Sequence, residues 1–200
     1  NSNIVVNFTE AVDVESGNII IYNASNDSAV ETIDVTSGQV TGSGSTQITI
    51  DPSSDLAEQT SYYVQIAATA FDDSYGNSYA GISDTTSLSF TTTDETAPTF
   101  SSAATNTAGT KVILTYNEAL SSTTAATSAF AVTSGGSSNS VSSVAISGST
   151  VELTLATTVK NDEVVTFAYT DPSSGNDSNA IQDSSGNDVI SLSSTSVTNN

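Results

Sequence analysis

Short runs of alternating apolar and polar residues follow one another along the chain, with Gly, Asn, Asp or Ser between them. A period of two is typical of strands with one buried face, and closely spaced short strands are typical of a β-sandwich. No segment has a convincing helical period, although residues 120–130 have room for one short turn. The pattern predicts strands at residues 3–8, 17–22, 29–35, 46–50, 62–70, 86–92, 99–104, 111–116, 129–133, 141–146, 151–155, 164–169 and 189–197.

A change of pattern divides the chain near its middle. One predicted strand ends at residue 92, Asp94 and Glu95 follow, and Pro98 precedes the next strand, where an edge strand tolerates proline. Each half then has about the size of an immunoglobulin-like sandwich, roughly 100 residues. We therefore predict an all-β chain of two tandem immunoglobulin-like Greek-key β-sandwiches. Residues 1–93 form the first, residues 94–98 an acidic linker, and residues 99–200 the second.

The two halves repeat two short motifs in the same order. Residues 7–12 (Asn-Phe-Thr-Glu-Ala-Val) align with residues 115–120 (Thr-Tyr-Asn-Glu-Ala-Leu), and an Asp-x-x-Gly-Asn motif occurs at 73–77 and again at 183–187. Such similarity indicates two variants of one module. The second half has a strand at 99–104 before its aligned strand, and the first half has none. We therefore predict that the first sandwich lacks its first strand. Either the sequence begins after that strand, or another chain segment or a neighbouring molecule completes the open edge.

The composition excludes several classes of function. The chain has 22 acidic and 2 basic side chains, a formal net charge of −20, and neither histidine nor cysteine. A Ser-His-Asp triad, a thiol nucleophile and the usual zinc or copper ligands are therefore absent, and we expect no enzymatic activity. The negative charge opposes binding to nucleic acids and anionic lipids, and no run is long enough to insert into a membrane. A bacterial cell-surface or extracellular location fits this acidic chain without disulfides.

Strand order brings acidic residues together at one end of the second sandwich. Loops that follow every second strand lie at the same end, and the linker enters there with Asp94 and Glu95. In the second half these loops contain Glu118 and the acid-rich stretch 171–188. The loops of the first half expected to face them contain Asp27, Asp51, Asp55 and Glu58.

Carboxylates gathered in this way repel one another, by about 1 kcal/mol per pair at 4 Å in water and by more when partly buried. Lys111 and Lys160 are the only basic side chains, so a bound cation is the simplest remedy. Calcium fits best, because it accepts 6–8 oxygen ligands in a flexible geometry, including Asn and backbone carbonyl oxygens. We therefore predict Ca²⁺ as a cofactor.

Two sets of metal ligands are predicted. The first set, at the junction of the two sandwiches, is Asp94 or Glu95 with Glu118, Asp183, Asn187 and Asp188. The second set, equivalent by the repeat, is Glu10, Asp73 and Asn77, with Asp13 or Asp72 as further candidates. A purely structural role is equally open for each Asp-x-x-Gly-Asn motif, because such a sequence forms turns in which Asp accepts bonds from backbone amides. The acidity also has a simple alternative, solubility at high salt without any specific site.

The motifs resemble two known families. Residues 8–12 (Phe-Thr-Glu-Ala-Val), Leu-x-x-x-Thr-x-Tyr-Tyr at 56–63, Asp73-x-x-Gly76-Asn77 and Phe-Thr-Thr at 90–92 resemble the bacterial Ig-like domain of S-layer type. Residues 116–120 (Tyr-Asn-Glu-Ala-Leu), Val-x-Leu-x-Leu at 151–155, Val-x-x-x-Ala-Tyr at 164–169 and Asp183-x-x-Gly186-Asn187 are similar to repeats of the cyanobacterial swimming-motility surface protein. This resemblance implies modules of large bacterial surface proteins and adhesins.

Three functions follow as expectations. The first is a calcium-stiffened spacer of a large adhesin, whose partners are neighbouring domains of the same long chain. The second is a calcium-dependent module that binds a cell-surface glycan or protein through loops that include Tyr75 and Tyr79, although one of these rings could instead close the end of the sandwich. The third is an accessory domain of a secreted polysaccharide hydrolase.

Overall fold

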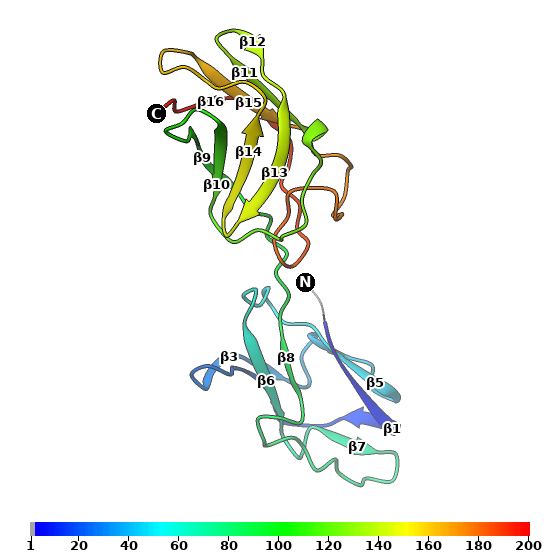
Figure 1. Cartoon of the computed structure of the whole chain (residues 1–200). Helices are drawn as coiled ribbons and strands as arrows, with labels where there is room; N and C mark the ends of the chain where they lie inside the picture. Colours follow the sequence, from blue (N-terminus) through cyan, green and yellow to red (C-terminus); the bar gives the residue numbers. More distant parts are fainter. Residues whose placement is uncertain (1–2) are drawn as a thin grey trace. The chain divides into compact units, whose positions relative to one another are not determined.

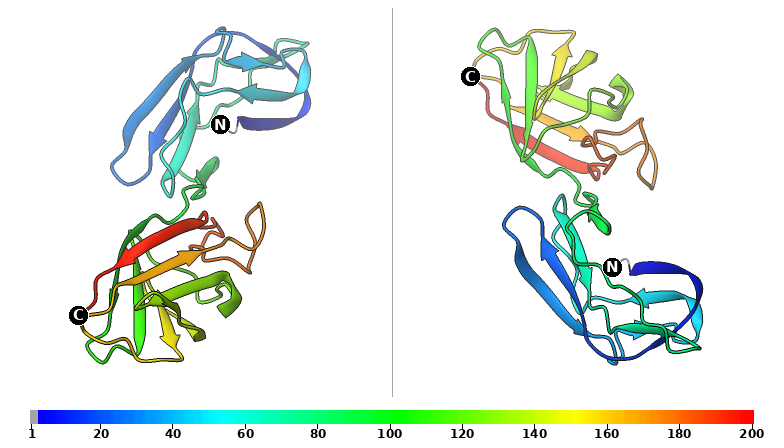
Figure 2. Two further views of the ribbon diagram at one scale, coloured as in Figure 1. Left: turned by 90° about the horizontal axis from the view of Figure 1, so that it is seen from above. Right: turned by 90° about the horizontal axis from the view of Figure 1, so that it is seen from below.

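The computed structural model describes residues 3–200, so that residues 1 and 2 of the predicted first domain lie outside it. The chain divides into two compact units, Asn1–Thr93 and Asp94–Asn200. Strands build both units (Figures 1 and 2). The described part contains no α-helix and one 3-10 turn at Thr127–Ala129, within the segment expected to hold a short turn. The predicted all-β class with two sandwich-like domains is confirmed. No helix in residues 3–200 has the length and apolar character needed to cross a bilayer.

The first unit consists of two antiparallel sheets. One has the strand order β4-β5-β1-β7, with bounds Val40–Thr41, Ser45–Ile50, Ile4–Val14 and Phe71–Asp73. The other has the order β3-β2-β6-β8, with bounds Ser28–Asp34, Asn18–Asn23, Ser61–Ile66 and Ser89–Thr91. Alternate residues of these strands, such as Ile19, Ile48 and Val64, are fully buried between the sheets.

The second unit repeats this arrangement. One sheet has the order β13-β14-β10-β9, with bounds Val141–Ser147, Thr150–Leu155, Lys111–Tyr116 and Phe100–Thr105. The other has the order β12-β11-β15-β16, with bounds Ser137–Ser138, Phe130–Ser134, Val165–Tyr169 and Leu192–Val197. In Figure 2 the orange and red strands β15 and β16 lie side by side. Leu114, Leu153 and Phe167 are among the residues that form the core.

β1 is longer than predicted, because the chain stays extended beyond Phe8. Residues Ile4–Asn7 pair with β5, the register shifts before Val12, and Val12–Val14 then pair with the short strand β7. Such an irregularity lets one strand bend between two partners. The prediction that this strand ends at Phe8 is wrong. Glu10 therefore lies within β1, near its bend, and is exposed.

The two units differ at β1 and β10, the strands that contain the aligned residues of the repeat. In the second unit β9 pairs with β10 from Val112 to Tyr116, on the side away from β14. Within residues 3–200, β1 pairs on the corresponding side only with β7, and only from Val12 onward. The segment from Ile4 to Ala11 therefore has an open edge in the described structure.

Candidate metal centre

Both Asp-x-x-Gly-Asn motifs form the same hydrogen-bonded turn. In the first unit, Oδ1 of Asp73 accepts bonds from the backbone amides of Tyr75 and Asn77, both at 2.8 Å, and Oδ2 accepts one from Nδ2 of Asn77 at 2.7 Å. Gly76 has φ of 79°, in the left-handed region that favours glycine. The structural role that the sequence left open for this motif is therefore present.

The turn in the second unit has equivalent bonds. Oδ1 of Asp183 accepts from the amides of Ser185 and Asn187, at 2.7 and 2.9 Å, and Oδ2 accepts from Nδ2 of Asn187 at 2.8 Å. Gly186 has φ of 90°. A carboxylate has about four lone-pair positions, so that these three bonds leave Asp183 able to accept a further ligand.

The segment before β9 is fixed to this turn. Nδ2 of Asn187 also donates to the backbone oxygen of Asp94, at 3.0 Å. Further along, the Thr99 amide donates to Oδ1 of Asn117 at 2.6 Å, and the Asn117 amide donates to the Thr99 oxygen at 3.1 Å. Pro98 between these contacts is buried. The start of the second unit is therefore attached to the corner of its own sandwich at both ends of the segment 94–99.

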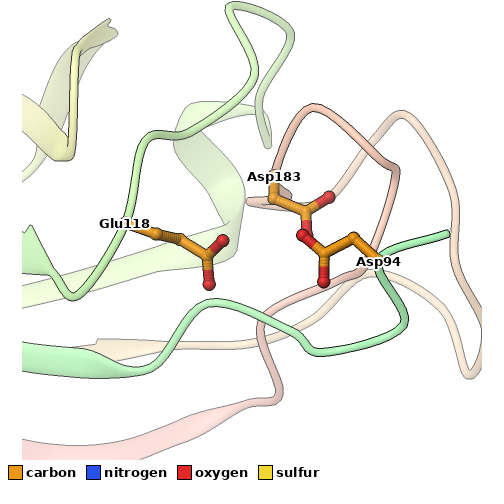
Figure 3. A group of neighbouring side chains, drawn as sticks. All are labelled: Asp94, Glu118 and Asp183. Carbon is orange, nitrogen blue, oxygen red and sulfur yellow. The ribbon is translucent and has the colours of Figure 1, made fainter. Parts of the chain in front are cut away.

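These contacts bring three carboxylates together (Figure 3). Asp94 comes from the segment before β9, Glu118 from the segment after β10, and Asp183 from the loop before β16. One oxygen from each residue lies within 4.8 Å of the others. An isolated bridge between Leu120 and Asp183 holds the second and third segments together. This group, which we call the acidic triad, could hold a metal ion.

The electrostatics of the acidic triad are those of a site that favours positive charge. Partial burial raises the pKa of the Glu118 carboxyl, and the neighbouring Asp94 and Asp183 carboxylates raise it further. Burial also acts to raise the pKa of Asp183, which is only 2% exposed, but the bonds from Asn187 and Ser185 outweigh that effect and lower it. Asp183 is therefore held ionised beside a glutamate whose ionisation is opposed.

Basic side chains do not neutralise this corner. Nζ of Lys111 pairs with Oε2 of Glu152 at 2.6 Å, near the start of β10, whereas the acidic triad lies beyond the end of that strand. Lys160 belongs to the loop before β15, and the amide of its neighbour Val159 bonds to Gly109 in the loop before β10. Both lysines therefore lie toward the opposite end of the sandwich.

The other predicted ligands of the junction set have different places. Asn187 presents Nδ2, a donor, to both Asp183 and Asp94. Asp188 is 8% exposed, and its Oδ2 accepts a bond from the backbone amide of Asp177 at 2.7 Å. Burial raises the pKa of Asp188, and the carboxylates of Asp177, Asp171 and Asp183 raise it further. Glu95 is exposed and is not a member of the acidic triad. For these residues, metal binding remains a prediction.

The equivalent set in the first unit is more open. Asn7, Glu10, Asp73 and Asn77 help to line a shallow cavity of about 350 Å³. Hydrogen bonds from Asn77 lower the pKa of Asp73. Asp13 and Asp72 oppose one another in the β1–β7 ladder, directly beside the pair Val12 and Asp73. Adjacent strand residues point to opposite faces, so that Asp13 and Asp72 lie on the other face of the sheet from Asp73.

The sequence pattern predicts no metal-binding or structural role for Asp177 in particular. Its amide donates to Asp188, and its own carboxylate accepts bonds from Ser173 and from the amide of Asn179. The acid-rich stretch 171–188 was visible in the sequence. The spacing of the acids along this stretch does not distinguish Asp183, which belongs to the triad, from Asp177 and Asp188, which accept bonds within the loop. The reason is that the loop has no regular secondary structure.

Comparison with known families now assigns both halves of the chain. Residues 1–92 match the family described as a bacterial Ig-like domain, and residues 93–174 match the family of flagellar system-associated repeats. The chain therefore contains a bacterial Ig-like domain at residues 1–92 followed by a flagellar system-associated repeat at residues 93–174, and residues 175–200 lie outside both matches. The predicted family resemblance is confirmed. The Ig-like domain and the repeat are modules typical of bacterial surface proteins, and such modules are typically non-catalytic. No curated protein matches the chain.

Proposed function

We propose that this segment is a calcium-stiffened spacer of a large bacterial cell-surface or secreted adhesin. The observation that supports the proposal is the acidic triad, in which Asp94 of the predicted linker meets Glu118 and Asp183. A calcium ion accepts oxygen ligands at 2.3–2.6 Å and tolerates two-oxygen binding by carboxylates. Three carboxylates, completed by water, satisfy its coordination, and the positive charge offsets the repulsion that opposes ionisation of Glu118.

The mechanism is attachment of the linker. With calcium bound, the carboxylate of Asp94 and the Asn187 bond to its backbone oxygen together hold the start of the segment 94–98 against the second sandwich. Without calcium, the like charges of the triad favour release of Asp94. The number of linker residues free to move therefore depends on the ion, and extracellular calcium keeps the spacer stiff.

Calcium titration of the full chain, with thermal unfolding as the readout, tests this function. Extracellular modules bind calcium with dissociation constants of about 0.1–1 mM, and saturation at 100 times that constant adds about 2.7 kcal/mol to stability. For a sandwich of this size we expect a rise of roughly 10 °C in the melting temperature of the second unit. Small-angle scattering with and without a chelator measures the accompanying change in overall dimensions.

Glu118→Gln and Asp162→Asn form a matched pair of variants. Glu118→Gln removes one triad charge, so that the calcium-dependent rise should disappear, while stability in chelator stays equal or increases. Asp162→Asn removes one charge from an exposed position in the loop before β15 and should leave the calcium response intact. A smooth rise with sodium chloride and no saturable response to calcium would instead support the solubility explanation of the acidity.

Tyr75 supports a second candidate, a calcium-dependent module for a glycan or peptide. Its ring is 89% exposed on the Asp73 turn, where an aromatic face could stack on a sugar. Tyr79 instead packs against Phe8, with ring centroids 5.2 Å apart, and helps to close the sandwich. A glycan array probed with and without chelator tests this candidate, because a pure spacer gives no signal that depends on both calcium and Tyr75.

A further inference from the structure

Asparagine followed two residues later by Ser or Thr occurs at four places in the chain, and two of these motifs lie in the turn between β2 and β3. The four begin at Asn7, Asn23, Asn26 and Asn176. A motif of this kind, with any middle residue except proline, is the acceptor sequence for asparagine-linked glycosylation of secreted proteins. The motif alone is common in a chain rich in Ser and Thr, so that the structure around each asparagine has to distinguish them.

Both asparagines of the β2–β3 turn have the same local geometry. Oδ1 of Asn26 accepts bonds from the backbone amide and the hydroxyl of Ser28, at 3.0 and 2.7 Å. Oδ1 of Asn23 accepts the equivalent bonds from Ser25, at 2.9 and 2.6 Å. Each motif therefore closes on itself through its third residue. Both bonds end on the amide oxygen, so that Nδ2, the atom that glycosylation modifies, takes no part in them.

This geometry favours substitution at Nδ2. Donors that point at Oδ1 stabilise the negative charge that develops on that oxygen as Nδ2 loses a proton. The nitrogen then forms a bond to the anomeric carbon of a sugar, and the bond from that carbon to a diphosphate oxygen breaks. The diphosphate leaves with the electron pair, and the proton goes to a base of the transferase. The required donor is therefore a sugar activated as its diphosphate.

The other two motifs lack this geometry. Oδ1 of Asn7 accepts a bond from Nε2 of Gln47 at 3.0 Å, across the β1–β5 ladder. Oδ1 of Asn176 accepts a bond from the backbone amide of Asp188 at 3.2 Å. Within residues 3–200, the third residue of neither motif donates to its own asparagine. Their side-chain amides are instead held by other segments of the chain.

Accessibility separates the two asparagines of the turn. Residues 24–30 are all exposed, including Asn26, whereas Asn23 is the last residue of β2 and is half-buried. The hydroxyl of Tyr63 donates to Oδ1 of Asp27 at 3.2 Å, so that the middle residue of the Asn26 motif is held against β6. The side chain of Asn26 therefore lies at the exposed end of a fixed turn.

We propose that Asn26 is a site of asparagine-linked glycosylation. The preorganised bonds from Ser28 and the exposure of the turn together select this residue among the four motifs. An attached glycan lies over the end of the β2–β3 hairpin, beside Val30, which is 48% exposed. This inference does not depend on calcium or on the acidic triad.

Mass spectrometry of the protein isolated from its native cells tests the proposal. Electron-transfer fragmentation of its peptides keeps a sugar on the residue that carries it and so identifies that residue. We expect a sugar on Asn26 in most molecules, on Asn23 in fewer, and none on Asn7 or Asn176. Unmodified Asn26, or sugar found only at other residues, overturns the proposal.

Ser28→Ala and Ser28→Thr form a matched pair of variants, expressed in the same cells. Ser28→Ala removes the hydroxyl and should abolish modification of Asn26, whereas Ser28→Thr keeps the hydroxyl and should retain it. Ser25→Ala removes only the motif of Asn23 and should leave Asn26 modified. Thermal unfolding of each variant shows whether the first unit still folds. An unchanged level of sugar on Asn26 in Ser28→Ala overturns the proposed role of the turn.

Discussion

The turns at Asp73 and Asp183 share a sequence motif and a hydrogen-bond pattern, but they differ in burial. Asp183 and Asn187 are 2% and 6% exposed, whereas Asp73 is partly exposed and Asn77 is exposed. The segment before β9 contributes to the difference, because the backbone oxygen of Asp94 accepts a bond from Asn187 of the second turn. A motif can therefore keep its geometry while neighbouring segments decide whether its carboxylate faces water or other carboxylates.

Replacing the aspartate of each turn should give the largest difference in stability loss between the two units. Asp183→Ala leaves the amide and Nδ2 donors of the buried Asn187 without their acceptor, and we expect the second unit to lose about 2–4 kcal/mol of unfolding free energy. Asp73→Ala exposes its donors to water and should cost the first unit about 1 kcal/mol. Urea unfolding followed by hydrogen exchange in each unit measures both losses. Equal losses would show that burial does not distinguish these turns.

Replacement of the glycines should have a smaller effect, and a similar one in both turns. Gly76 and Gly186 have positive φ, and a side chain in that conformation costs about 1 kcal/mol. Neither glycine has a neighbour closer than 4 Å to an added Cβ atom. Backbone strain is therefore the main cause of the expected loss in stability. We expect Gly76→Ala and Gly186→Ala to destabilise their units alike. Thermal unfolding of both variants checks this, and a much larger loss for Gly186→Ala would indicate a packing role.

The response to pH should be the smallest effect, and it should differ in shape between the units. In the first unit the shifted carboxyl groups, those of Glu31, Asp34, Asp73 and Asp84, all have lowered pKa values. Their stabilisation is present above the ordinary pKa and is lost as pH falls through the lowered one, so stability only decreases on acidification.

The second unit contains Glu118, whose pKa is raised. Without metal, its ionisation opposes folding at neutral pH, and this penalty is relieved as pH falls through the raised pKa toward the ordinary value of 4.5. Further acidification protonates Asp183, whose pKa is lowered, and stability then falls. Unfolding measured in chelator between pH 7 and pH 3 should show a shallow maximum for the second unit only. Glu118→Gln should lower that maximum and leave the contribution of Asp188, whose pKa is also raised by burial. An unchanged maximum in this variant would contradict the assignment.

The fold could be predicted from the sequence because burial in a sandwich leaves a period of two. Lys111–Tyr116 forms a strand over the residues predicted, with Val112, Leu114 and Tyr116 buried. β7, at Phe71–Asp73, could not be separated from the preceding predicted strand at residues 62–70, because three residues are too few to show a period. The extension of β1 was missed for a related reason, since its irregular register between Asn7 and Val12 interrupts the alternation.

The acidic triad could be predicted in part. Strand order alone placed Asp94, Glu118 and Asp183 at one end of the second sandwich, and these residues lie together. The sequence could not show that Asp188 contacts the backbone of Asp177, because the orientation of a side chain in an irregular loop depends on contacts remote in sequence. The expected participation of Asp27, Asp51, Asp55 and Glu58 in a junction between the sandwiches remains a prediction.

The bridge between Ala104 and Thr198 is parallel, and this has a mechanical consequence. β9 lies close to the start of the second unit, and Thr198 directly follows its last strand, β16. Tension applied to these two ends pulls parallel neighbours in opposite directions, so that the Thr105–Thr198 and Thr198–Ala103 bonds are loaded in shear at the same time. Bonds loaded together resist force better than bonds that open one after another, so that these two bonds oppose separation of the two segments under tension.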